Sequence, residues 1–83
     1  MQEITIDFLK NNGFQFIPIS GEFEWHPIEG VIIILEKTKK GNWLLYIEKR
    51  VSESIHTECK YISEIQEALH YVGLHDIADK IKY

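Results

Sequence analysis

The stretch Gly30–Arg50, GVIIILEKTKKGNWLLYIEKR, decides the fold of this 83-residue chain. It contains two apolar runs, Val31–Leu35 and Trp43–Ile47, whose β-branched and aromatic residues suit a packed sheet. The segment between them includes Gly41, which can take the positive φ that a short hairpin loop requires. The pattern therefore predicts one long β-hairpin that closes at residues 39–41.

This loop sets the register of the hairpin, with Leu35 opposite Leu45 and Ile34 opposite Tyr46. Because side chains alternate along a strand, the hairpin has two different faces. The face expected to form the core carries Val31, Ile33, Leu35, Trp43, Leu45 and Ile47. The other face carries Ile32, Ile34, Leu44 and Tyr46, together with Glu36, Glu48 and Arg50. Ile32, Ile34, Leu44 and Tyr46 make this second face too apolar for water, so we expect a helix or another molecule to cover it.

The segments before the hairpin supply a helix and two strands. Ile4–Gly13 is expected to be a short helix with Thr5 as its N-cap. Phe14–Ile19 and the alternating stretch Glu22–His26 are typical of strands, and Pro27 to Gly30 is expected to turn the chain into the hairpin.

The segments after the hairpin supply a turn over Val51–Ser54, a short strand over Ile55–Lys60 and two helices. The first helix begins at Tyr61, where Ser63 and Gln66 fit a capping box, and Gly73 ends it. Its apolar stripe consists of Ile62, Ile65, Leu69 and Val72. Together these segments predict a single α+β domain over residues 1–83. It has a short N-terminal helix, a four- to five-stranded antiparallel meander and two C-terminal helices packed on the sheet.

Composition is typical of a small globular domain. Hydrophobic residues make up 45% of the chain and charged residues 27%. The single Cys59 forms no disulfide framework and suits a reducing compartment. The N-terminal segment lacks the pattern of a signal peptide, and the apolar runs are too short to span a membrane. We therefore expect a cytoplasmic protein.

The net charge of −4 is unevenly distributed along the chain. Residues 1–36 contain six acidic residues and one lysine, and residues 51–83 contain six acidic residues and three lysines. Residues 37–50 instead contain five basic residues and one glutamate. The nucleic-acid candidates are therefore Lys37, Lys39, Lys40, Trp43, Lys49 and Arg50, expected around the hairpin tip. Lysines at strand ends are more often a guard against edge pairing, and the acidic balance disfavours phosphate binding.

Catalytic and metal-binding patterns are weak. His56 and Cys59 lie three residues apart, but a structural zinc site needs four ligands. His70, His75, Asp76 and Asp79 surround Gly73, where caps and solvated polar faces are the commoner explanation. Glu36 and Glu48 share a face without the cleft that acid–base chemistry requires. We therefore expect no metal, no cofactor and no catalytic residue.

The final helices carry a resemblance to known proteins. Tyr61-Ile62-Ser63-Glu64-Ile65-Gln66, followed by Leu69 and Gly73, resembles the ending of a group of small proteins from anaerobic gut bacteria and their phages. The start of the chain, Phe8-Leu9 to Gly13-Phe14, is similar to theirs. About a quarter of the chain carries the match, and Ser63 replaces the more usual histidine. The resemblance implies a helix–meander–helix fold and a phage or mobile-element origin, and it transfers no catalytic residue.

The sequence thus favours a small protein-interaction or accessory protein that docks a protein partner or forms a homodimer. The alternatives are a nucleic-acid-associated accessory factor and an acidic inhibitor that occupies the basic site of a host nucleic-acid enzyme.

Overall fold

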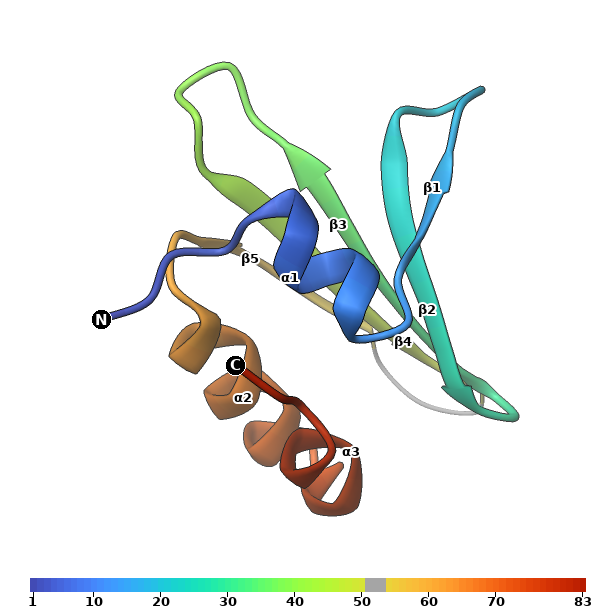
Figure 1. The fold of residues 1–83 in the computed structure, drawn as a ribbon. Helices are drawn as coiled ribbons and strands as arrows, with labels where there is room; N and C mark the ends of the chain where they lie inside the picture. Colours follow the sequence, from blue (N-terminus) through green and yellow to red (C-terminus); the bar gives the residue numbers. More distant parts are fainter. Residues whose placement is uncertain (51–53) are drawn as a thin grey trace.

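The fold is an antiparallel meander with helices at both ends of the chain, as Figure 1 shows in a computed structural model that describes residues 1–50 and 54–83. The elements are α1 (Ile6–Asn11), β1 (Gln15–Ile17), β2 (Glu22–Ile28), β3 (Val31–Lys37), β4 (Trp43–Lys49), β5 (Ile55–Cys59), α2 (Ile62–Tyr71) and α3 (His75–Asp79). The five strands pair in sequence order. The predicted α+β fold is confirmed. The expected turn over Val51–Ser54 falls mainly on residues 51–53, which lie outside the described residues.

The β3–β4 hairpin has the predicted register. Leu35 lies opposite Leu45, and Ile34 lies opposite Tyr46. At the loop, the Thr38 amide donates to the Asn42 carbonyl at 2.9 Å, and Gly41 takes a φ of +91°. Addition of a side chain at Gly41 would therefore strain the loop.

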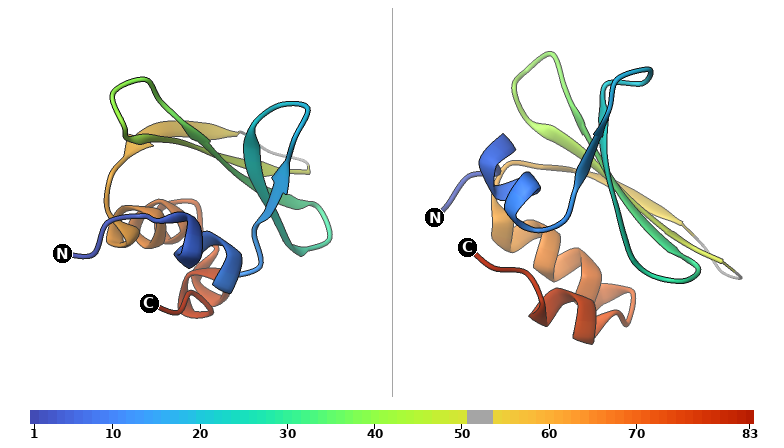
Figure 2. Two further views of the ribbon diagram at one scale, coloured as in Figure 1. Left: turned by 45° about the horizontal axis from the view of Figure 1, so that its top comes forward. Right: turned by 45° about the vertical axis from the view of Figure 1, so that its right-hand side comes forward.

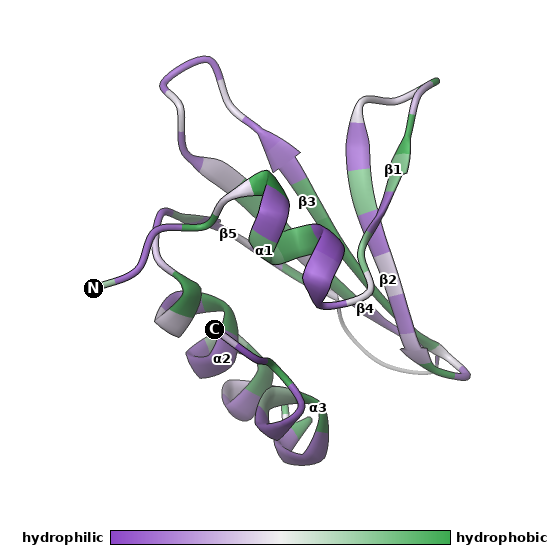
Figure 3. Cartoon of the chain, in the orientation of Figure 1, coloured by the Kyte–Doolittle hydropathy of each residue, from purple (hydrophilic) through white to green (hydrophobic). Residues whose placement is uncertain are grey.

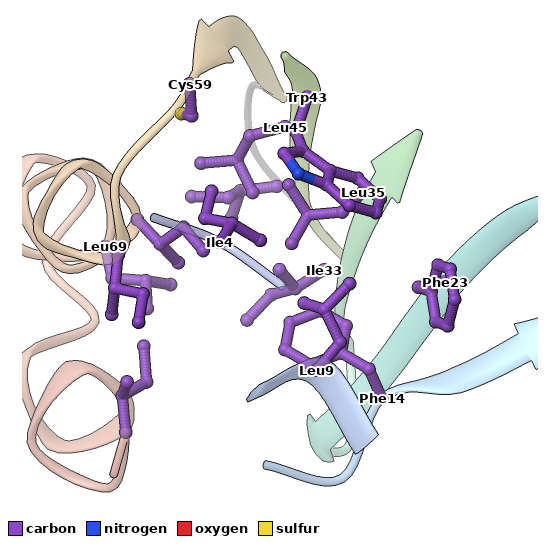
Figure 4. Packing of buried hydrophobic residues seen from close by; sticks show 14 of the residues in the cluster. Ile4, Leu9, Phe14, Phe23, Ile33, Leu35, Trp43, Leu45, Cys59 and Leu69 are labelled. Carbon is purple, nitrogen blue, oxygen red and sulfur yellow. The ribbon is translucent and has the colours of Figure 1, made fainter. Parts of the chain in front are cut away.

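All three helices lie on one side of the sheet, and Figure 2 shows this from two further directions. The core between the layers contains the expected hairpin residues and the apolar stripe of α2, and Figure 4 shows how their side chains converge. Leu9, Ile33, Leu35, Leu45, Ile65 and Leu69 are completely buried. Because every described helix is on this side, the core has formed on only one face of the sheet.

The N-terminal helix ends much as the sequence indicates. The Thr5 hydroxyl accepts from the Phe8 amide at 3.1 Å, as an N-cap does. The Phe14 amide donates to the Leu9 carbonyl at 2.9 Å after Gly13, whose φ is +90°. This return of the chain places Phe14 in the core beside Leu9.

The sequence prediction for the end of β2 was wrong. Strand β2 continues to Ile28, past the predicted end at His26, and its pairing with β3 is irregular between Trp25 and Ile28. Strand β1 pairs only with residues 22–24, so the part of β2 around Pro27 has no β1 partner. A proline is tolerated there because no hydrogen bond to β1 requires the backbone N–H that proline lacks.

At the start of α2, Ser63 does not act as a cap. Helix α2 begins two residues earlier than the capping box requires, with Tyr61 as its N-cap, and the Ser63 hydroxyl is buried with no hydrogen-bond partner. The Glu64 carboxylate instead accepts from the Lys60 and Tyr61 amides, each at 2.8 Å. The apolar positions Leu74, Ile77, Ala78 and Ile81 predict a second C-terminal helix that reaches the end of the chain, but the observed helix α3 is shorter. It ends at Asp79, although Ile81 beyond it is still buried.

Candidate interaction surface

The side of the sheet away from the helices carries two rows of aligned side chains. The first row contains Gln15, Glu24, Ile34, Tyr46 and His56. The second row contains Ile17, Glu22, Glu36, Leu44 and Glu58. Beside them, Ile32 pairs with Glu48. We call this surface the open face, and it contains all four interface candidates that the sequence suggests.

The apolar centre of the open face consists of Ile32, Ile34, Leu44 and Tyr46. All four side chains are half-buried by their neighbours on the sheet, and no described helix covers them (Figure 2). Leu45, which follows Leu44 on the same strand, is completely buried on the other side. Of the two covers expected for this face, a helix or another molecule, the described helices of the chain do not supply the first.

Acidic side chains surround this apolar centre. The five glutamates of the open face are Glu22, Glu24, Glu36, Glu48 and Glu58. Glu22 and Glu36 lie directly opposite each other on neighbouring strands, an arrangement of like charges that destabilises a sheet. The described residues of the two rows include no lysine or arginine. At one end of the face, the Arg50 guanidinium lies 3.3 Å from the Glu29 carboxylate, so this exposed pair adds no net charge to the face.

A hollow of about 640 Å³ adjoins this end of the open face. Ile28, Ile32 and Glu48 line it, together with His26 and Arg50. The Ile28 side chain is 48% exposed. The hollow thus offers an apolar wall at the border of the same surface, and its charged lining is balanced, because Glu29 and Glu48 lie beside Lys49 and Arg50.

The nucleic-acid candidates do not form one cluster. Trp43 is buried in the core with its ring edge against Phe23, and Lys37 Nζ lies 4.6 Å from the centre of its ring. Lys49 and Arg50 lie at the opposite end of β4, about 20 Å away at the usual rise per residue. Lys49 Nζ donates to the Val72 carbonyl at 3.1 Å, at the C-terminal end of α2. Trp43 therefore presents no free ring on which a base could stack.

The loop between β3 and β4 retains Lys39 and Lys40, both exposed. Figure 3 shows this loop as a hydrophilic segment. Because Trp43 is buried and Lys49 and Arg50 lie at the other end of β4, the basic residues at the hairpin tip are only Lys37, Lys39 and Lys40 among the six candidates.

The candidate metal and catalytic groups also separate. Cys59 points into the core, while His56 packs against Tyr46 on the open face, with 5.7 Å between ring centres. Burial, with Glu64, Glu58 and Glu67 nearby, raises the pKa of the Cys59 thiol to about 12. A thiol with this pKa is protonated and unreactive at neutral pH.

His70 and His75 lie together across the Gly73 corner, with their Nδ1 atoms 2.7 Å apart. No third histidine, cysteine or carboxylate joins them to make a group that could hold a metal, within the part of the chain that the structure describes. Glu36 and Glu48 are separated by four residues along the sheet, about 13 Å, which is too far for a carboxylate pair.

Sequence reasoning missed Glu22, Glu24 and Glu58 as part of this surface. Their strands were expected, but the alternation within one hairpin does not fix its register against the neighbouring strands. The signal was present in part, because the alternation of Glu22–His26 already placed its glutamates on one side and Phe23 on the other.

Comparison of the chain with protein-family models, with curated protein sequences and with solved structures finds no match. No helix in residues 1–50 and 54–83 has the length and apolar character needed to cross a membrane.

Proposed function

We propose that this chain is a non-catalytic, cytoplasmic protein-interaction module that docks another protein on the open face of its sheet. The observation that carries the proposal is the apolar centre formed by Ile32, Ile34, Leu44 and Tyr46. These side chains lie on a layer that the described helices leave uncovered. Apolar surface of this kind is characteristic of an interface, since burial against a partner removes it from water.

Several observations support a binding role over a catalytic or nucleic-acid-associated one. The thiol of Cys59 is buried and, with its raised pKa, protonated at neutral pH. Trp43 is buried, and the open face carries glutamates that repel phosphate. We further propose, from the sequence pattern of residues 61–73 alone, that the module is an accessory protein of phage or mobile-element origin.

Capture experiments in the native cell test this function. A tagged wild-type chain would be cross-linked in cells and compared with an Ile34→Thr/Leu44→Thr variant, in which threonine suits a strand but removes apolar area. A Tyr71→Ser variant is the control, since Tyr71 is 80% exposed and lies outside the open face. We expect the double variant alone to lose specific cross-links. Equal cross-linking by all three proteins would rule out the open face as the docking site.

A further inference from the structure

We propose that the partner of the open face is a protein surface that combines apolar side chains with lysine or arginine, and that it is not a second copy of this chain. This inference rests on the proposed docking function and names the chemistry of the partner. It follows from the charges around the apolar centre, from the size of the face and from the unfavourable pairing of Glu22 with Glu36.

The charges exclude a neutral or identical partner on physical grounds. With the histidines neutral, the five glutamates give the two rows and the Ile32–Glu48 pair a charge of −5. A symmetric dimer would bring the same patch of each copy together and place these carboxylates against one another. A purely apolar partner would remove them from water without compensation. Cationic side chains around an apolar centre would satisfy both requirements.

The size of the face leads to the same conclusion. The three central strands have seven residues each, which span about 20 Å at about 3.3 Å per residue, and the outer strands are shorter. With five strands about 4.8 Å apart, the footprint is at most about 20 by 20 Å. This is about half of the 800 Å² per partner typical of a stable interface. Apolar burial on this scale is small, so electrostatic attraction must supply much of the affinity and the specificity.

The facing glutamates give independent support. Glu22 and Glu36 repel each other across β2 and β3 in the free protein, at a cost to folding. Residues that break a local rule of stability are expected where they serve a function. Lysine or arginine placed between the two carboxylates by a partner would turn this repulsion into attraction.

A charge-swapped copy of the chain provides a folded probe of defined chemistry. Glu24→Lys, Glu36→Lys and Glu48→Lys together retain the apolar centre and change the face from five negative charges to three positive and two negative ones. The matched control carries Glu3→Lys, Glu67→Lys and Asp79→Lys, three exposed positions outside the open face. Both variants have the same net charge, because each substitution adds two charges to the wild-type value of −4. Aligned packing of two like sheets gives the mixed pair a feasible geometry.

Sedimentation velocity of wild type mixed with each variant tests whether the open face binds a basic partner surface. We expect wild type alone to be monomeric at about 50 μM and its mixture with the open-face variant to form a heterodimer. This heterodimer should weaken roughly tenfold when salt rises from about 0.05 to 0.5 M, since salt screens the charges. The mixture with the control variant should remain monomeric. No heterodimer with the open-face variant would overturn the inference.

Two further outcomes distinguish a failure of this inference from a failure of the proposed docking function. If wild type alone dimerises and Ile34→Thr/Leu44→Thr abolishes the dimer, the open face docks protein but the basic-partner inference fails. If that double variant leaves the charge-driven heterodimer unchanged, the charges act without the apolar centre and the proposed docking function fails. Binding of a 20-nucleotide single-stranded DNA to wild type at low salt would also count against the inference, because the partner would then be anionic.

Discussion

Leu44 and Leu45 are neighbours on β4 with the same side chain, but they lie on opposite faces of one sheet. Leu45 is completely buried beneath the helices, whereas Leu44 is half-buried on the open face among glutamates. On the covered face, every apolar side chain contributes to folding. On the open face, a smaller group of apolar residues lies among glutamates and contributes less to folding, which leaves its burial available for binding.

The sharpest test of this contrast uses two thiols on β5. Cys59 lies on the covered face, and a His56→Cys variant would add an exposed thiol on the open face. Because burial raises the pKa of Cys59 from 9.0 to about 12, its thiolate fraction at pH 8 falls about 1000-fold. A thiolate of higher pKa is also a stronger nucleophile, which offsets part of this factor. We therefore expect iodoacetamide to modify the introduced thiol roughly 100-fold faster, as mass spectrometry would show. Comparable rates would mean that the core at Cys59 opens readily.

The same pKa shift has a consequence for stability at high pH. A thiol whose pKa is higher in the folded than in the unfolded state stabilises the fold below pH 9. This stabilisation is lost as pH rises from about 9 towards 12, because the unfolded chain ionises first. Urea unfolding between pH 8 and 10.5 should show this decline, and a Cys59→Val variant should show a weaker one.

The second test truncates the two leucines. Leu45→Ala should lower the free energy of unfolding by about 3 kcal/mol, since it leaves a cavity in the core. Leu44→Ala should cost about 1 kcal/mol or less, because its side chain is already partly in water. Chemical denaturation of both variants measures the difference. Equal losses would mean that the open face is as important for folding as the covered one.

The third test concerns the helix that covers the sheet. Glu64→Ala removes the carboxylate that accepts from the Lys60 and Tyr61 amides, and should lower the free energy of unfolding by about 1 kcal/mol. Glu67→Ala is the matched control, since Glu67 is exposed on the same helix and makes no such contact in the described residues. Thermal unfolding should distinguish the two variants. No difference would show that the N-terminus of α2 is held by packing alone.

The smallest expected effect is a gain in stability on the open face. Glu36→Gln removes the repulsion from Glu22 and should raise the free energy of unfolding by about 0.5 kcal/mol, with Glu67→Gln as the control. Added salt should stabilise wild type more than the variant, because salt screens the same repulsion. If Glu36→Gln instead lowered the free energy of unfolding, the proposal that repulsion between Glu22 and Glu36 destabilises the free protein would be wrong.

Local chemistry explains why much of the fold was predictable. Gly41 determines the loop and therefore the register of β3 and β4, and Thr5 and Gly13 mark the ends of α1. The errors lie where distant segments decide the outcome. Pro27 remains in a strand because β1 is short, and Glu64 replaces Ser63 as the cap because α2 starts earlier.

The candidate interaction surface was predictable only in its centre. The alternation along one hairpin identifies Ile34 and Leu44, but the acidic surround requires the register of β2 and β5 against that hairpin. The face of the sheet on which the helices pack could not be predicted from the hairpin alone, because both of its faces carry apolar side chains. The separation of Lys49 from the hairpin tip follows from the length of β4, which the sequence already indicates.

Both termini lie on the helical side, away from the open face (Figures 1 and 2). Hydrogen bonds hold each of them: the Ile4 amide donates to the Lys60 carbonyl, and the Lys82 amide donates to the Asn12 side chain. A tag, fluorescent protein or solid support joined to either end would therefore lie on the helical side of the molecule. The open face of the sheet would remain exposed to solvent and accessible to a partner.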